Sequence, residues 1–515
     1  MRARSGSAKP AQALPVKKIL LFAIPAVILI IAVIIVISVL GGSGGAITKN
    51  HICFFSDTDE MIVSGNNNAK FKIDGKMYSS HLSIDGSKAA LLTDYDNIDG
   101  GALWFVTPSG YTLIANYVVA YQLADSGNGV AYFTDYDNRN NLATLYLYDT
   151  ASKKAALITE DALFTGDDEM PGVSISPDGK SVSYISDYDK RSGDCAGYLK
   201  IDGKSPEKLG EMIYAVAISD GGKYIYYCKD DTDGRSISLY VRSARNDNRL
   251  ASGAYSLSMM LNRDYSEIVY NVYDGDVRSF VSRKGNERER ISGASVMDLV
   301  LPRGTQAKSF SNGDVDIIVY GISAFSGFVA VTDDGLAYYD SRFEANKIAG
   351  SSAHAYSAEI SNDGKTLYYV NNTGRLSYID PSVVGAERRE IGKNVQLFTV
   401  SSDGKSVYFI NDDNELYYMS ANGVSSKIAD DIYTGYLVAS YSGDKVFFLT
   451  DYRSNRGGEL YFSNNGGAKT KVQGADEVMN IWSTPANIFY ISRDDELFRS
   501  NGNEKFVRFH DQIDR

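Results

Sequence analysis

An all-β fold of repeated four-stranded antiparallel sheets is what this sequence predicts, and three observations lead to it. First, a short phrase recurs along the chain, with clear copies at residues 175–180, 218–223, 360–365 and 400–405. Second, each copy joins an apolar strand to an aromatic or β-branched strand through a turn with Gly, which is a strong hairpin signal. Third, most neighbouring copies lie about 40 to 50 residues apart, the period of the four-stranded blades of a β-propeller.

The repeats extend over most of the chain, with third strands such as 103–106 and weaker fourth strands such as 427–429. One such sheet cannot bury both faces, so the sheets are expected to stack radially, with 37 Tyr and 21 Phe filling the wedges between them. An extra strand pair at 51–55 and 69–73 precedes the full sets. About ten full strand sets follow, which begin near Tyr78, Val118, Pro171, Ile213, Tyr255, Ser311, Tyr356, Val395, Tyr433 and Val478.

The number of repeats bears on the domain organisation. Ten sets exceed the ~4–8 blades of a usual ring, which favours two rings in tandem, with blades at 51–300 and 301–515. The irregular stretch 301–307 would be the junction between them. One large ring is the alternative.

The clearest copy of the repeat is Ser176-Pro-Asp-Gly-Lys180, followed by an apolar strand. It resembles the repeat of TolB-like, WD40-like propeller proteins, and the resemblance covers about residues 80–510, with a poor fit at 299–350. The resemblance implies a propeller fold. It implies no single function, because that family includes scaffolds, periplasmic proteins that interact with lipoproteins, and non-catalytic domains of peptidases.

A membrane anchor is predicted before the repeats. Residues 19–40 carry no charge, and a helix of that length reaches roughly 33 Å, enough for a hydrocarbon core of ~30 Å. The basic tail at 1–18 has no acidic residue, which predicts a cytoplasmic N-terminus, a Gly-rich linker at 41–50 and an extracytoplasmic bulk. A cleaved secretory signal is the alternative. We expect a single-pass signal anchor in a bacterial envelope, with a Gram-positive surface favoured.

Composition excludes some functions. The formal charge of −12 becomes about −17 beyond the basic tail (47 basic against 64 acidic residues), which argues against nucleic-acid binding. The three cysteines form no metal-binding pair. Cys195 and Cys228 lie in adjacent repeats, and the sequence leaves open whether they form a disulfide or stay free.

One loop repeats an unusual phrase between the second and third strands. It reads Thr-Asp-Tyr-Asp or a close variant, and its candidate site residues are Asp94, Tyr95, Asp96, Asp135, Tyr136, Asp137, Asp187, Tyr188, Asp189, Asp451 and Tyr452. Equivalent loops of a propeller emerge on one face, so an arc of carboxylates and phenols is expected at one rim. Such a rim suits a sugar, a cationic peptide or Ca²⁺; the alternative is that Asp supplies ordinary turns in duplicated blades.

These features predict a membrane-anchored extracytoplasmic propeller that binds an envelope protein or a cell-wall polymer. We expect no catalytic residues and no cofactor, because the four His form no nucleophile constellation and no Gly-x-Ser-x-Gly elbow occurs. The chain is therefore predicted not to be an enzyme. The alternative is a glycosidase or lyase that uses rim carboxylates such as Asp96 and Asp137, and a third hypothesis is a Ca²⁺-stabilised structural module.

Overall fold

The computed structural model covers the predicted repeats. It describes residues 52–510 except 57–59, 65–69, 98, 165–171, 232–235, 244–245, 287–288, 292–293, 303–304, 306, 312–313, 323–324, 326, 350–357, 421–422, 484–488, 494–495 and 501–504. Within this part of the chain, no helix is long and apolar enough to cross a membrane. The predicted tail, anchor and linker at 1–50 lie outside the described residues.

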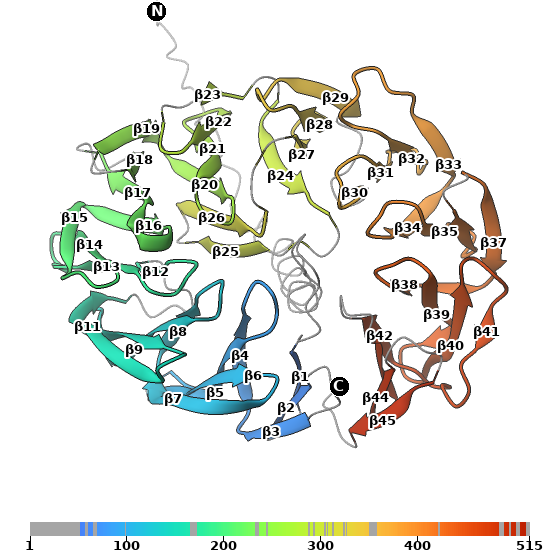
Figure 1. The fold of residues 1–515 in the computed structure, drawn as a ribbon, viewed down its shortest axis with the longest axis horizontal. Coiled ribbons are helices and arrows are strands. Elements are labelled where there is room, and N and C mark those ends of the chain that lie inside the picture. Colours follow the sequence, from blue (N-terminus) through green and yellow to red (C-terminus); the bar gives the residue numbers. More distant parts are fainter. Residues whose placement is uncertain are drawn as a thin grey trace, which may run out of the picture.

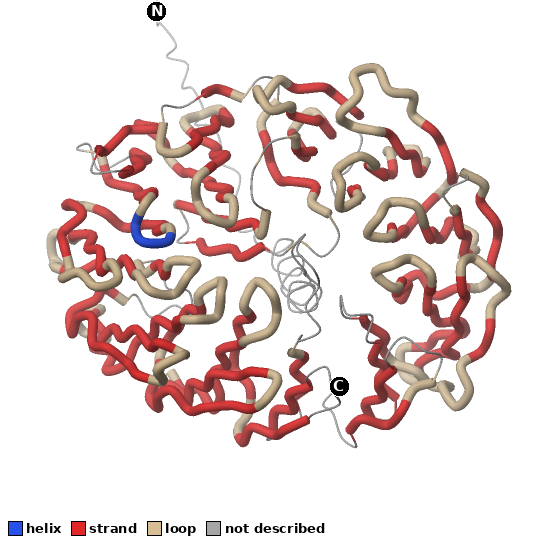
Figure 2. Tube along the Cα trace, viewed as in Figure 1, coloured by secondary structure: helices blue, strands red, loops and turns tan. Residues whose placement is uncertain are grey.

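Eleven antiparallel-based sheets follow one another in sequence order around one elliptical ring (Figure 1), which is the second of the two arrangements that the sequence leaves open. In each four-stranded sheet the first strand lies toward the centre and the fourth toward the outside. Strands and turns make up almost everything that is drawn (Figure 2), with one short 3-10 turn, η1 (Asp220–Gly222). Radially arranged four-stranded sheets define a β-propeller, as predicted.

The first half of the ring begins with a three-stranded sheet: β1 (Cys53–Ser56), β2 (Glu60–Ser64) and β3 (Lys70–Asp74). Four blades follow: β4 (Met77–Leu82), β5 (Ala89–Asp96), β6 (Gly100–Thr107), β7 (Gly110–Val118); β8 (Ala120–Leu123), β9 (Gly129–Asp137), β10 (Leu142–Asp149), β11 (Lys154–Leu163); β12 (Ser174–Ile175), β13 (Val182–Ser186), β14 (Ala196–Lys200), β15 (Glu207–Glu211); β16 (Ile213–Ile218), β17 (Tyr224–Asp230), β18 (Ile237–Ser243), β19 (Asn246–Ala254).

The middle of the chain forms two interleaved sheets: β20 (Ser256–Leu261), β21 (Glu267–Tyr273), β22 (Val277–Arg283), β23 (Glu289–Arg290) with β25 (Ala307–Ser311) and β26 (Val315–Tyr320); and β24 (Val296–Val300), β27 (Phe328–Thr332), β28 (Gly335–Tyr339), β29 (Ala345–Ala349). The last four blades are β30 (Ala358–Ile360), β31 (Leu367–Val370), β32 (Leu376–Ile379), β33 (Arg389–Gly392); β34 (Val395–Val400), β35 (Val407–Asn411), β36 (Leu416–Met419), β37 (Ser425–Ala429); β38 (Ile432–Ala439), β39 (Lys445–Arg453), β40 (Gly457–Asn464), β41 (Thr470–Lys471); β42 (Asn480–Ser483), β43 (Phe489–Arg493), β44 (Glu496–Ser500), β45 (Val507–His510).

Nine of the ten predicted strand sets begin within a few residues of an observed blade, and the sixth does not. The sixth blade begins with β24 at Val296, whereas the sequence predicts Ser311 as its start. The hairpin β25–β26 reads as the beginning of a blade, but β26 pairs in parallel with β20 of the preceding sheet. The hairpin is therefore an insertion on the inner edge of that sheet, next to the proposed domain junction at 301–307, and the division at 300/301 stays a prediction.

The recurrent Ser-x-Asp-Gly phrase forms the turn between the first and second strands. Ser176 Oγ donates to Asp178 Oδ1 at 2.6 Å, and the backbone N–H of Ser181 donates back to Ser176 Oγ at 2.9 Å. Ser361 and Ser401 repeat the first bond, each to its Asp at 2.7 Å. The side chains thus satisfy backbone groups that a tight turn leaves unpaired, which explains why this phrase recurs.

Neighbouring blades are joined through these same turns. The N–H of Ser402 donates to the carbonyl of Tyr441 in the next turn at 2.9 Å. The buried Tyr408, on β35, reaches across as well, because its hydroxyl donates to the Gly443 carbonyl at 3.1 Å. Tyr368 makes the equivalent bond to Gly404 at 2.7 Å. The hydroxyl groups of Tyr368 and Tyr408 therefore link neighbouring blades by hydrogen bonds, and we call such a residue a latch tyrosine.

Removing one latch hydroxyl is expected to destabilise the fold. Tyr408→Phe leaves the Gly443 carbonyl without this donor, and we expect a loss of about 1–3 kcal/mol in the free energy of unfolding, measured by urea denaturation of the full chain. Tyr226 is the matched control, because it occupies the same strand position but its buried hydroxyl has no hydrogen-bond partner among the described residues. Tyr226→Phe is expected to be neutral or stabilising. Equal losses in both variants would refute the latch.

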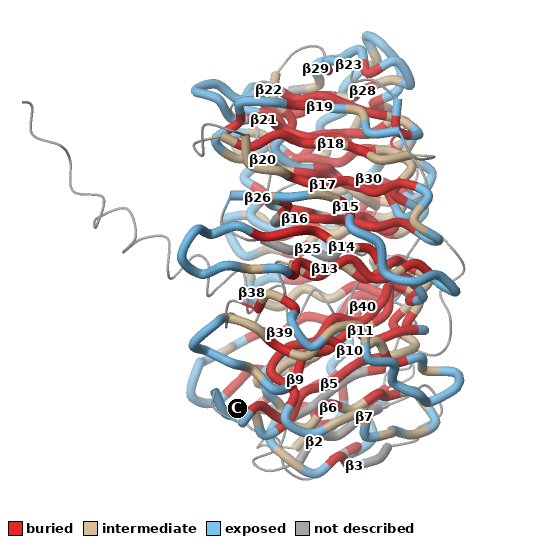
Figure 3. The backbone as a smooth tube through the Cα atoms, turned by 90° about the vertical axis from the view of Figure 1, so that its left-hand side faces the viewer, coloured by how far each residue is buried: buried red, intermediate tan, exposed pale blue. Residues whose placement is uncertain are grey.

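The hydrophobic core is divided into wedges between blades. Buried residues follow the strands and exposed ones gather at the turns on the two faces of the ring (Figure 3). One wedge, for example, joins Tyr408 and Leu416 of one blade to Ile432 and Val446 of the next. The three-stranded sheet takes part too, since Ile52 and Ile73 pack with Ala89, Leu91 and Val106 of the next blade. Each blade is thus stabilised by its neighbours.

Cys195 and Cys228, the two cysteines whose side chains the structure describes, are free thiols. Cys195 and Cys228 are both buried and form no disulfide with each other. Burial raises the pKa of Cys195 to about 11, and it raises the pKa of Cys228 further. Thiols in such surroundings are unreactive, so they serve as small packing residues.

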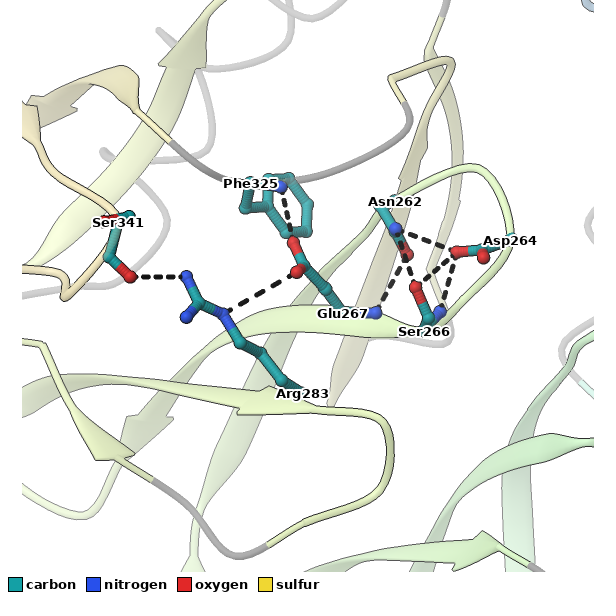
Figure 4. A network of polar contacts seen from close by, with 7 residues as sticks. All are labelled: Asn262, Asp264, Ser266, Glu267, Arg283, Phe325 and Ser341. Atoms are coloured by element: carbon teal, nitrogen blue, oxygen red, sulfur yellow. Dashed lines mark hydrogen bonds and ion pairs between the residues drawn. The ribbon is translucent and has the colours of Figure 1, made fainter.

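A polar network ties the inserted hairpin to the ring (Figure 4). Glu267, at the start of β21, accepts the backbone N–H of Phe325 at 2.6 Å through Oε2, and its Oε1 lies 3.6 Å from Arg283 Nε. Arg283 also donates to the Ser341 carbonyl at 2.9 Å and lies 4.2 Å from the centre of the Phe343 ring. One carboxylate thereby connects the segment after β26 with the turn between β28 and β29.

Candidate functional site

The Asp-Tyr motif has a backbone role in three blades. In β5, β9 and β39 its first aspartate lies within the strand with a positive φ: Asp94 at 51°, Asp135 at 53° and Asp451 at 51°. Pairing with the third strand shifts at this point, as it does after Thr93 and after Thr450. The motif is therefore a β-bulge with aspartate in the left-handed region, which Asp tolerates better than most residues.

The third strand of the blade lies unusually close to the backbone of the bulge in the second strand. A Cβ added to Gly101 would lie 2.5 Å from the carbonyl oxygen of Thr93, and one on Gly458 would lie 2.7 Å from that of Thr450. In these two blades a glycine faces the aspartate bulge, whereas in blade β8–β11 the equivalent residue is Ala143. The bulge accounts for part of the repetition, for which the sequence left open a ligand-binding rim or ordinary turns.

The first aspartates of three copies have different partners. Asp94 accepts the N–H of Lys76 at 2.9 Å, and Asp135 accepts the hydroxyl of Thr134 at 2.7 Å. Asp187 accepts the hydroxyl of Tyr198 and pairs with Lys208 at 3.2 Å. The hydrogen bond from Tyr198, assisted by Lys208, lowers the pKa of Asp187.

The second aspartate stabilises the turn that follows. Asp137 accepts the N–H of Arg139 at 2.9 Å and the side-chain amide of Asn140 at 2.7 Å, and these bonds lower its pKa. Asp189 accepts the N–H of Arg191 at 2.8 Å, and Asp96 that of Asp99 at 3.3 Å. A glycosidase needs one carboxyl group with a raised pKa as its general acid, so Asp137 does not suit that role.

The tyrosines of the motif form the most distinctive part of the rim. Tyr95 stacks on Tyr78 with ring centres 4.1 Å apart, and Tyr452 stacks on Tyr433 at 4.2 Å. In each pair the tyrosine of the first strand is open to solvent: Tyr78 is 42% exposed and Tyr433 is 39% exposed. Tyr136 instead packs edge-on against Phe164 at 4.9 Å. The same stacked pair thus recurs in blades β4–β7 and β38–β41.

Sequence reasoning missed Tyr78 and Tyr433 as site residues. The available signal was a tyrosine directly after the first residue of the inner strand, in two of the blades that carry the motif. Antiparallel pairing brings the start of the first strand next to the end of the second, which makes such a pair foreseeable. Tyr117, which is 69% exposed with a φ of 61°, lies beside the same turn near Gly100.

The structure brings three copies of the motif into neighbouring blades and leaves the fourth apart. Blades β4–β7, β8–β11 and β12–β15 are adjacent in the ring, whereas β38–β41 lies beyond β42–β45 and β1–β3 (Figure 1). Lys190 joins two of the adjacent loops by donating to the Arg139 carbonyl at 2.7 Å. The exposed loop of the third copy holds Tyr188 half-buried between Asp187 and Asp189.

Asp187 also belongs to a pattern on the outer strands. In that blade Lys208 bridges Asp187 and Glu211, while Lys427 bridges Glu415 and Asp430 in blade β34–β37. A third copy joins Lys471 to both Glu459 and Asp476. In each case a tyrosine of the third strand donates a hydrogen bond to one of the two carboxylates. The pairs are Tyr198 with Asp187, Tyr417 with Glu415 and Tyr461 with Glu459. The recurrence indicates that Asp187 helps to hold the fourth strand.

The described part of the chain contains no group of three or more His, Cys, Asp or Glu side chains placed to hold a metal ion. The rim carboxylates are spread along the arc, and six of the seven accept hydrogen bonds from nearby donors. They therefore do not converge into the cage of about 6–8 oxygens that Ca²⁺ takes.

Comparisons with known proteins concern the fold. The sequence matches no protein-family profile and no curated protein. Solved structures with a similar fold include a eukaryotic initiation factor, at 12% identity and a TM-score of 0.43, covering 74% of this chain and 97% of that one. TolB from Acinetobacter baumannii is 13% identical with a TM-score of 0.29, covering 57% of this chain and 77% of that one. Dipeptidyl peptidase 4 from Porphyromonas gingivalis is 12% identical with a TM-score of 0.38, covering 81% and 66%.

One expectation is corrected by these comparisons. The sequence analysis predicts that the chain is not an enzyme, and peptidases are among the structures that share its fold. The prediction is wrong as an exclusion, because propellers of this kind occur in hydrolases. Similarity at this level describes the fold and assigns no activity to this chain.

Proposed function

We propose that this chain is a membrane-anchored, extracytoplasmic propeller that binds another envelope protein through its aspartate and tyrosine rim. The observation that carries the proposal is the pair of half-exposed stacked tyrosines, Tyr78–Tyr95 and Tyr433–Tyr452, repeated at the same place in two blades. Tyrosine is enriched at the energetic centres of protein interfaces, because it offers a large rigid surface with a polar tip.

The surroundings of the pairs support a protein partner. Tyr95 and Tyr452 pack against the wedge cores behind them, so the exposed rings of Tyr78 and Tyr433 have fixed orientations. Little side-chain entropy is then lost on binding. Exposed Asp94 beside the first pair would favour a partner with basic residues. The predicted anchor at 19–40 would hold this rim near other envelope proteins.

Loss of the two exposed rings should weaken partner binding strongly. We expect Tyr78→Ala with Tyr433→Ala to weaken capture of the partner at least about 30-fold, because truncation of an interface centre costs about 2 kcal/mol or more. The measurement is affinity isolation of the tagged full chain from cross-linked membranes, with purified peptidoglycan sedimentation run in parallel. Val384→Ala is the control, since Val384 is 83% exposed between β32 and β33, on the opposite face.

The two assays separate the alternatives. Loss of one protein from the isolate, with peptidoglycan binding absent or unchanged, supports the proposal. Loss of peptidoglycan binding alone would assign the rim to a cell-wall polymer, and an unchanged result in both assays would reject the rim as the contact.

A further inference from the structure

A cavity lies between blades β30–β33 and β34–β37, across the ring from the bulges of β5 and β9. It has a volume of about 370 Å³ and lies between β33 and the β35–β37 face of the next blade. Its lining includes Ile391, Gly392, Phe409, Asn411, Tyr417 and Ser425. The volume falls within the about 300–1,000 Å³ of small-molecule sites.

A glycine in β33 allows the aromatic wall of this cavity to lie close to that strand. In the fourth strand, the residue opposite the recurrent leucine of the third strand is alanine in four other blades: Ala115, Ala251, Ala349 and Ala429. In blade β30–β33 this position, opposite Leu376, is Gly392. A Cβ at Gly392 would lie 2.9 Å from Phe409 Cε2 and 2.9 Å from Val395 Cγ2. The glycine therefore lets Phe409 and Val395 pack closer to β33 than a residue with a Cβ would allow.

One wall of the cavity is aromatic and held in place. Phe409 and Tyr417 stack with their ring centres 5.2 Å apart and their planes 8° apart. The Tyr417 hydroxyl donates to Glu415 at 2.8 Å, and the same carboxylate accepts the amide of Asn411 at 2.8 Å. The wall thus combines a rigid apolar surface with polar groups at its edge.

The charges around the mouth are balanced. Glu390 pairs with Arg375 at 2.6 Å, and Glu415 pairs with Lys427 at 2.5 Å. The bond from Lys427, with those from Tyr417 and Asn411, lowers the pKa of Glu415 to about 2, so it stays an ionised acceptor. Because these charges neutralise one another, the cavity has little preference for a charged ligand. A neutral ligand with one apolar face and several hydroxyl groups matches this lining.

We propose that this groove between blades binds a saccharide ring, with the ring face against Tyr417 and its hydroxyl groups toward Asn411, Ser425 and Lys393, which also lines the cavity. The site lies in blades that carry no stacked tyrosine pair, and the proposal does not depend on the rim partner. It would give the propeller a carbohydrate contact on its outer wall.

The test is ligand-observed saturation-transfer NMR on the full chain with glucose, N-acetylglucosamine, maltose and chitobiose. We expect at least one of these probes to bind, and its Kd to rise about tenfold or more in Gly392→Ala and in Tyr417→Ala, a change of about 1.4 kcal/mol or more. Tyr461→Ala is the matched control, because Tyr461 makes the same carboxylate bond one blade further on but packs toward Ala429. It should leave the Kd unchanged.

Two results would overturn the proposal: no probe binds the wild-type chain, or Gly392→Ala binds as tightly as the wild type. If Gly392→Ala loses its cooperative unfolding, Ser425→Leu blocks the same mouth from an exposed position and carries the test. Tyr78→Ala and Tyr433→Ala should bind the saccharide normally, so failure of this site and failure of the rim proposal are distinguishable.

Discussion

Gly179→Ala is expected to destabilise the propeller severely. Gly179 lies in the Ser-x-Asp-Gly turn of blade β12–β15 with a φ of 79°, where a side chain costs about 1–2 kcal/mol. A Cβ there would also overlap the backbone N of Gly129 in the preceding blade, and overpacking adds about 1–3 kcal/mol. We expect a loss of about 2–5 kcal/mol in the free energy of unfolding, measured by urea denaturation of the full chain.

The same turn provides the control. Gly364 has a φ of 71° at the equivalent position, and nothing lies within 4 Å of the Cβ it would gain. Gly364→Ala should therefore cost only the conformational part, about 1–2 kcal/mol. If the two variants lose the same stability, close contact between neighbouring turns does not hold the blades together.

Removal of the Glu267 carboxylate is the second change with a large expected effect. Glu267→Ala removes the acceptor of the Phe325 N–H and the negative charge that faces Arg283. The side chain of Glu267 is 16% exposed and that of Arg283 is 33% exposed. A hydrogen bond to a charged group contributes about 1.5–3 kcal/mol, and the stranded guanidinium adds to the loss. We expect about 3 kcal/mol in urea unfolding, with faster proteolysis near the inserted hairpin.

Two further variants show whether the loss of stability comes from the hydrogen-bond network or only from the change in charge. Glu267→Gln keeps an acceptor for Phe325 and should lose roughly half as much. Arg342→Ala removes a cation that pairs with Asp340 but is 73% exposed, so its cost should stay below about 1 kcal/mol. A small effect of Glu267→Ala, equal to that of Arg342→Ala, would show that the hairpin is held by packing alone.

Much of the fold was predictable because it is local. The Ser-x-Asp-Gly turn, the aromatic second strand and the repeat period are each encoded within a few residues, and they place nine blades correctly. The inserted hairpin β25–β26 was not predictable, because its parallel pairing with β20 joins residues far apart in the sequence. The period of a repeat says nothing about which sheet an extra hairpin joins.

The candidate site was predictable in part. The motif does lie at the ends of second strands, but its positive φ values and the opposing Gly101 reveal a β-bulge that residue types alone do not show. Stacking of Tyr78 on Tyr95 depends on strand pairing, and the close approach of Phe409 to Gly392 beside the cavity depends on how one blade packs against the next. Both are visible only once blades are packed.

The central claim, that the tyrosine rim contacts an envelope protein, is tested most directly by photo-crosslinking in cells. A photoreactive phenylalanine analogue replaces Tyr433 in one full-length chain and Val384, on the opposite face, in another. We predict one discrete crosslinked protein from position 433 and none from position 384. The same crosslinked protein from position 384, or no crosslinked protein from position 433, would contradict it.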